Sequence, residues 1–240
     1  MAITYDAVST GSDTSTTTVS ATHTCAGSDR CVVVVASGIR NQETDWSWST
    51  VTYDGESMTK QQEDGGNRST GRDMRTSIWT LLDPPTTASA TVTATASGAS
   101  ILSASIAVIS FANVSAVGAS NVAKGTSTAP SVSVTTTVEN SWLVGGVGAA
   151  EQSAVSDTPG TGVTERWDFE APGNYTNDDH NSMGGHRAAT TTGSYAFAYT
   201  IPDSDYWQAV AVEITPIPVG GGSDLFGAVM HSSNPYARIL

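Results

Sequence analysis

The sequence predicts an all-β protein, and two observations support this prediction. Short runs of Thr, Ser, Val and Ala alternate with period two, as in residues 88–96 (ASATVTATA), and they lack the spacing of an amphipathic helix. Gly, Pro, Asn and Asp interrupt these runs roughly every dozen residues, as turns do in a sandwich or a jelly roll. We therefore expect a single jelly-roll-like β-sandwich of about a dozen strands, followed by an extended C-terminal arm.

The expected strands follow the alternating runs, and no segment has the pattern of a helix. Asp54-Gly55 lies between two such runs and predicts a tight hairpin, because both residues tolerate positive φ. Pro84-Pro85 ends another run, since proline cannot donate to a strand ladder. The expected strands cover residues 16–23, 31–37, 48–53, 57–61, 76–82, 91–96, 101–111, 131–137, 141–147, 162–167, 188–192, 195–200 and 207–214.

Segments without periodicity are expected to be loops. Residues 63–73 and 152–162 are polar and rich in Gly, Ser or Asp, and residues 170–186 run for 17 residues without alternation. A loop of that length in a compact domain is often functional. The loops at 41–47, 63–73 and 170–186 are therefore candidates for a binding end.

The composition excludes several classes of partner. The net charge of −13 and the pI near 4.4 oppose binding to a phosphate backbone, so no nucleic-acid partner is expected. No apolar run approaches the roughly 18 residues of a membrane span, so no membrane is expected either. The N-terminal residues MAITYDAVSTGSDT lack the basic and apolar regions of a signal peptide, which predicts synthesis in a cytoplasm.

The last 22 residues differ from the rest of the chain. We expect a sandwich domain over residues 1–218, a Gly-rich hinge that begins at Val219, and an attachment arm that runs to residue 240. An arm with this much apolar surface requires a partner, either another protein or its own sandwich. The arm residues expected to make that contact are Leu225, Phe226, Val229, Met230, Tyr236, Ile239 and Leu240.

The two cysteines, Cys25 and Cys31, flank the turn-like residues AGSDR. They are candidates for a disulfide across a hairpin, with two reduced, half-buried thiols as the alternative. A zinc site is not expected, because two cysteines at this spacing lack the partner pair that a closed tetrahedral site needs.

Catalytic motifs are weak in this chain. No G-x-S-x-G motif occurs, and a Ser-His-Asp triad would have to use His23, His180, His186 or His231. The acids Glu165 and Asp168 do not by their spacing define a glycosidase pair. We therefore predict a protein that is not an enzyme and has no cofactor.

Two kinds of ligand remain open for the loops. Acidic and histidine side chains of residues 170–186 could bind a divalent cation, but a solvated polar loop explains them better and no metal site is assigned. Exposed aromatic residues could stack on a host glycan, although burial in a core also explains them. The candidate ligand residues are Trp46, Tyr175, Asp178, Asp179 and His180.

Several motifs occur in an order that resembles one group of proteins. They are HTCAGSDRCVVVVAS (23–37), VTYDGESMTK (51–60), SIWTLLDPPTTASATVTAT (77–95), ASIAVISF (104–111) and WQAVAVEI (207–214). In this order they resemble uncharacterised β-sandwich domains of the jelly-roll or lectin-like type in tailed-phage structural proteins. The resemblance spans residues 3–217 and leaves out the C-terminal arm.

The resemblance implies a non-enzymatic virion protein. A capsid decoration or head-associated protein is expected, attached through its arm to the major capsid protein or to another virion protein. By analogy with capsid decoration at threefold positions, the expected homo-oligomer is a trimer. The alternative is a receptor-binding or carbohydrate-binding module of a phage tail fibre, with the loops as its binding end.

Overall fold

The computed structural model describes residues 1–41, 46–68, 72–85, 89–98, 101–150, 157–172 and 180–218. These residues form seventeen strands and no helix, and every strand pairing is antiparallel. None of the described residues therefore forms a helix that could cross a membrane. The predicted all-β class and the sandwich-like packing of the sheets are confirmed, whereas the arm at 219–240 lies outside the described residues.

The first half of the chain forms two sheets. The first large sheet has the order β1-β9-β3-β7-β6, and the first outer sheet has the order β2-β8-β4-β5. The strands are β1 (Thr4–Thr16), β2 (Thr18–His23), β3 (Cys31–Asn41), β4 (Trp48–Tyr53), β5 (Glu56–Ser57), β6 (Thr59–Arg68), β7 (Arg72–Leu82), β8 (Ala90–Ala96) and β9 (Ile101–Ala112).

The second half also forms two sheets. The second large sheet has the order β10-β17-β12-β15-β14, and the second outer sheet has the order β11-β16-β13. The strands are β10 (Val114–Ser127), β11 (Ser131–Thr135), β12 (Ser141–Ala149), β13 (Thr158–Pro159), β14 (Val163–Ala171), β15 (His180–Ala189), β16 (Ser194–Thr200) and β17 (Asp205–Pro216).

The two halves have the same strand order. When β5 is set aside, each half has eight strands, and each strand of the first half has a counterpart at the same place in the second. The pairing is nested as in a jelly roll: the first strand of each half pairs with the last, and the second with the second to last. Asn113 alone separates the halves, with a φ of 62° that asparagine tolerates. The chain is thus a tandem repeat of one β topology.

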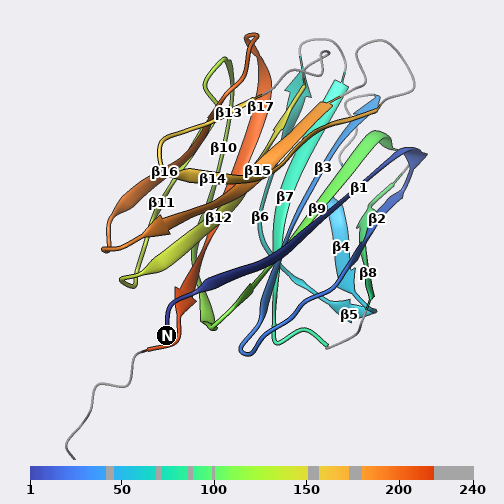
Figure 1. Cartoon of the computed structure of the whole chain (residues 1–240). Helices are drawn as coiled ribbons and strands as arrows, with labels where there is room; N and C mark the ends of the chain where they lie inside the picture. Colours follow the sequence, from blue (N-terminus) through green and yellow to red (C-terminus); the bar gives the residue numbers. More distant parts are fainter. Residues whose placement is uncertain are drawn as a thin grey trace, which may run out of the picture.

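The four sheets stack in the order first outer, first large, second large, second outer, as Figure 1 shows from right to left. Each pair of neighbouring sheets encloses its own apolar core. Strand β3 shows how this works, because Val32 and Val34 face the first outer sheet while Val33 and Val35 face the second large sheet. We call the cluster between the two large sheets the central core; it includes Ile78, Ile109, Val144, Trp167, Val210 and Val212.

The central core depends on glycines that make room for Trp167. A Cβ atom on Gly184 would lie 2.1 Å from the Cζ2 atom of the Trp167 indole, and one on Gly146 would lie 3.0 Å from the same atom. The Gly-rich runs of β12 and β15 therefore let a large ring lie flat against the second large sheet.

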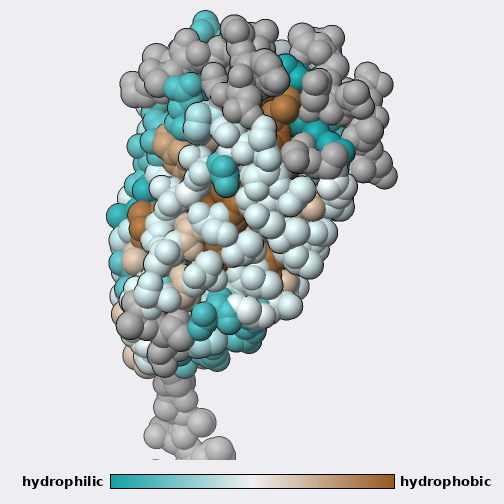
Figure 2. All heavy atoms as spheres, turned by 90° about the vertical axis from the view of Figure 1, so that its right-hand side faces the viewer, coloured by the Kyte–Doolittle hydropathy of each residue, from teal (hydrophilic) through white to brown (hydrophobic). Residues whose placement is uncertain are grey.

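The outward face of the first outer sheet is rich in hydroxyl groups along β2, β8 and β4. Thr18, Thr95 and Thr50 are neighbours across three strands, and the next row holds Ser20, Thr93 and Thr52. Figure 2 views the molecule from this side and shows a broad pale surface of near-neutral hydropathy.

The predicted hairpin at Asp54-Gly55 is confirmed, with φ of 50° and 85°. Other expectations about loops and strands need correction. Two of the segments expected to be loops, 63–73 and 170–186, lie partly in strands, since β6 extends to Arg68 and β15 begins at His180. Strands β1 and β10 were not expected over most of their length, because small and polar residues give them no apolar alternation.

We predict that the two halves can be expressed as separate chains. Fragments 1–112 and 113–218 should co-purify as a one-to-one complex when co-expressed, because each has its own two-sheet core and both bury apolar side chains in the central core. Affinity purification through a tag on one fragment measures this. Val212→Asp, which places a charge in the central core, should abolish the complex. Soluble fragments that never associate would contradict the prediction.

Candidate functional site

The strand ends that flank the predicted ligand loops meet at one end of the molecule, which we call the loop end. Asn41 pairs with Arg72 in the first large sheet, and Ala171 pairs with His180 in the second. The Ser103 hydroxyl joins the two sheets at this end, where it donates to the Ala171 carbonyl. Tyr175, Asp178 and Asp179 lie outside the described residues.

Trp46 is not an exposed platform for a sugar, so that hypothesis is wrong for this residue. Its side chain is 1% exposed and belongs to the core under the first outer sheet. The ring packs edge-on against Trp48, with centroids 5.7 Å apart, and the Arg75 guanidinium lies 5.8 Å from it. Its polar neighbours in the sequence give no indication of this burial.

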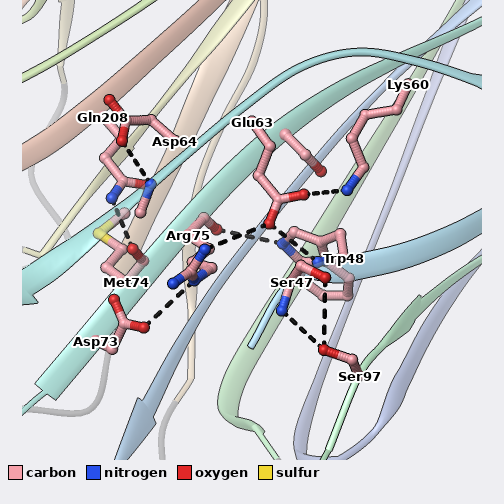
Figure 3. A network of polar contacts seen from close by, with 12 residues as sticks. Ser47, Trp48, Lys60, Glu63, Asp64, Asp73, Met74, Arg75, Ser97 and Gln208 are labelled. Carbon is pink, nitrogen blue, oxygen red and sulfur yellow. Dashed lines mark hydrogen bonds and ion pairs between the residues drawn. The ribbon is translucent and has the colours of Figure 1, made fainter. Parts of the chain in front are cut away.

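A network of charged and polar side chains crosses the loop end, as Figure 3 shows. Arg75 lies 3.3 Å from the Asp73 carboxylate and 3.9 Å from the Glu63 carboxylate, and Lys60 also pairs with Glu63. The Trp48 amide donates to Glu63 as well, at 3.2 Å. These contacts join β4, β6 and β7, and the cations neutralise the buried carboxylates.

The same region ties the two halves together. Lys124 of β10 donates to the Asp64 carboxylate of β6 at 2.8 Å, and this bond raises the pKa of Lys124. Gln208 of β17 donates to the Met74 carbonyl of β7 at 2.6 Å (Figure 3). The Lys124–Asp64 ion pair and the hydrogen bond from Gln208 to the Met74 carbonyl thus join the two halves. These contacts favour a structural role for the network over a catalytic one.

His180 is a buried structural residue and not a loop ligand. Its side chain is fully buried, with Nδ1 2.9 Å from the Ser103 hydroxyl and Nε2 2.9 Å from the Ser105 hydroxyl. Both serines lie on β9 of the other half. The expectation that His180 lies in a loop was wrong, because the strand β15 begins at this residue and the following residues Asn181, Ser182 and Met183 are buried with it.

His186 also lies in a packed environment. Its ring stacks on Trp142 at a centroid distance of 4.4 Å, and Phe111 of the first half meets it edge-on at 5.8 Å. Arg166 donates to its Nδ1 atom at 3.4 Å. Burial and the nearby Arg166 charge lower the pKa of His186 to about 4. The residue is therefore neutral at physiological pH and joins the two halves through its ring.

His23 belongs to a third buried polar group. Its ring nitrogens lie 3.0 Å from the Ser9 hydroxyl and 2.9 Å from the Ser110 hydroxyl, and Ser110 in turn donates to Asp6 at 2.7 Å. Burial lowers the pKa of His23. A catalytic triad places histidine between serine and aspartate, whereas here the serine lies between the other two. Ser110 is fully buried, so the serine that contacts Asp6 is not accessible to a substrate.

The two cysteines are free and buried, so the candidate disulfide does not form. Cys25 packs in the core beneath the first outer sheet, whereas Cys31 packs in the central core on the other face of the first large sheet. Burial raises the pKa of the Cys25 thiol to about 11 and raises that of Cys31 as well. Neither thiol is a reactive thiolate at neutral pH.

The acidic residues considered for catalysis do not form a site. Glu165 and Asp168 lie on the same strand, β14, so they do not face each other across a cleft. Burial raises the pKa of each carboxyl. Within the described ranges, no three His, Cys, Asp or Glu side chains gather closely enough to hold a metal ion.

An apolar pocket lies at the opposite end of the molecule, where the described chain ends. We call it the exit pocket; its volume is about 350 Å³. Met1 and Val138 line it and are 59% and 42% exposed, values that are unusual among the large apolar residues that the structure describes. The other lining residues are Ala2, Glu139, Asn140, Pro216, Ile217 and Pro218.

Hydrogen bonds hold the walls of the exit pocket together. The N-terminal ammonium of Met1 donates to the Ile217 carbonyl at 2.6 Å, and Asn113 donates through its side chain to the Ala2 carbonyl. The start of the chain, the junction of the halves and the end of β17 thus meet here, near the label N in Figure 1. Sequence reasoning missed this pocket because its walls come from three distant segments without a shared motif.

No family model, no curated protein and no solved structure matches this chain.

We predict that His186 makes the protein less stable in acid. The unfolded state binds a proton near pH 6.5 and the folded state only near pH 4, so the free energy of unfolding falls as the pH drops through this window. Between neutral pH and pH 5 the loss from this residue is about 2 kcal/mol. Urea unfolding at several pH values measures it.

The matched control is His186→Phe, which keeps a ring on Trp142 but does not titrate. Its stability should decrease less steeply between neutral pH and pH 5, while the contribution of His23, which has the same sign, remains. Equal slopes for the two proteins would contradict the assignment.

Proposed function

We propose that this chain is a non-enzymatic structural component of a virus particle, located on the outside of the capsid and attached through residues 219–240. The observation that carries the proposal is the exit pocket. Met1 and Val138 expose apolar surface beside Pro218, which directly precedes a segment with seven candidate apolar contact residues. Exposed apolar surface at such a place is typical of an interaction site.

The body of the protein supports a structural role. Its two halves share the central core, and its histidines within the described ranges are buried and held by neighbouring side chains. The net charge of −13 would keep the protein away from packaged nucleic acid. The resemblance of its motifs to phage structural domains agrees with this role.

A second candidate function is a glycan-binding or receptor-binding module of a tail fibre. The convergence of the strand ends at the loop end favours it, because binding residues often lie on loops held by a rigid scaffold. The burial of Trp46 removes one aromatic residue on which a sugar could stack. A glycan array distinguishes the two functions, since a decoration protein should bind no glycan.

We predict that deletion of residues 219–240 leaves a folded protein that no longer joins the particle. All strands of the described residues end at or before Pro216, so the thermal unfolding of the shortened chain should change little. Its amount in purified particles should fall at least tenfold, as measured by quantitative mass spectrometry. A control chain with a Gly-Ser linker of equal length in place of the segment separates its chemistry from its length. Incorporation at the native level would refute the proposal.

A further inference from the structure

We propose that the exit pocket binds the C-terminal segment of a second copy of this chain. The proposal rests on the proposed function, which makes residues 219–240 an assembly arm. It adds the surface that receives this arm and the identity of the partner, so that the protein builds its own oligomer by exchange of arms.

The pocket matches the arm in its chemistry. Its walls are mainly apolar, from Met1, Val138, Ile217 and two prolines, and the arm offers aliphatic and aromatic side chains such as Leu225 and Phe226. Burial of one such side chain contributes about 1.5–3 kcal/mol. Glu139 adds a carboxylate to the wall, and Arg238 is the single Lys or Arg residue of the arm.

The pocket also matches the arm in size and position. A volume of about 350 Å³ suits a few side chains of a peptide and not a globular surface. The arm of 22 residues spans at most roughly 75 Å when extended, enough to reach the corresponding pocket of a neighbour. Gly220, Gly221 and Gly222 separate it from the body with a sequence typical of a flexible linker.

Self-association of this chain must also overcome its charge. Two copies with a net charge of −13 repel each other across broad surfaces. The arm contains one Asp and one Arg, so it can approach a second copy with little electrostatic repulsion. The described walls of the pocket carry one negative group, Glu139, and one positive group, the Met1 ammonium.

The test uses two full-length variants, one defective in each partner surface. Val138→Asp places a charge in the pocket, and the double change Leu225→Asp with Phe226→Asp does so in the arm. We expect the wild-type chain to form an oligomer by light scattering and each variant to be monomeric. An equimolar mixture of the two variants should regain dimers, because one intact arm then meets one intact pocket.

Leu82→Asp is the matched control. Leu82 is a large apolar residue with 39% exposure that lines a different pocket, so its replacement should leave the oligomer unchanged. A mixture of the two variants that stays monomeric, or a wild-type chain that is monomeric at all concentrations, would overturn the arm exchange. If Val138→Asp also enters particles normally, the arm binds another virion protein, which overturns this inference but leaves the proposed function intact.

Discussion

The rest of the structure depends on the burial of both faces of the two large sheets. Strand β3 has apolar side chains on both faces because one face packs in the central core and the other beneath the first outer sheet. The same holds for β12 and β17 in the second half. Each large sheet therefore needs an outer sheet that covers the face turned away from the central core. Because both halves have the same topology, each half contributes one large sheet and one outer sheet.

Burial on both faces also explains where polar chemistry is found. Buried histidines pair with neighbouring side chains, as His180 does with Ser103 and Ser105, because an unpaired polar group in a core costs free energy. Interactions with partners are then left to the outer faces and to the two ends of the stack. The outward face of the first outer sheet is rich in hydroxyl groups, whereas the exit pocket at one end of the stack exposes the apolar side chains of Met1 and Val138.

Alternation predicted the strands that have one exposed face or a strongly apolar sequence, such as β8 and β9, together with the hairpin at Asp54-Gly55. It failed at β1 and β10, which occupy the same place in each half and are half-exposed edge strands of small residues. The sequence did not reveal the repeat, because the two halves share a strand order but not a pattern of side chains. The burial of Trp46 and His180 depends on contacts with distant strands, which no local pattern encodes.

The two halves of the protein meet in the central core, which both of them line. Native-state hydrogen exchange of the full chain tests the central claim, that the halves form one cooperative unit through the central core. We expect amides of β3 and β9 to exchange with the same free energy as those of β12 and β17, and only on global unfolding. If one half exchanges its large-sheet amides at a clearly lower free energy than the other, the two halves are independent and the central core does not unite them.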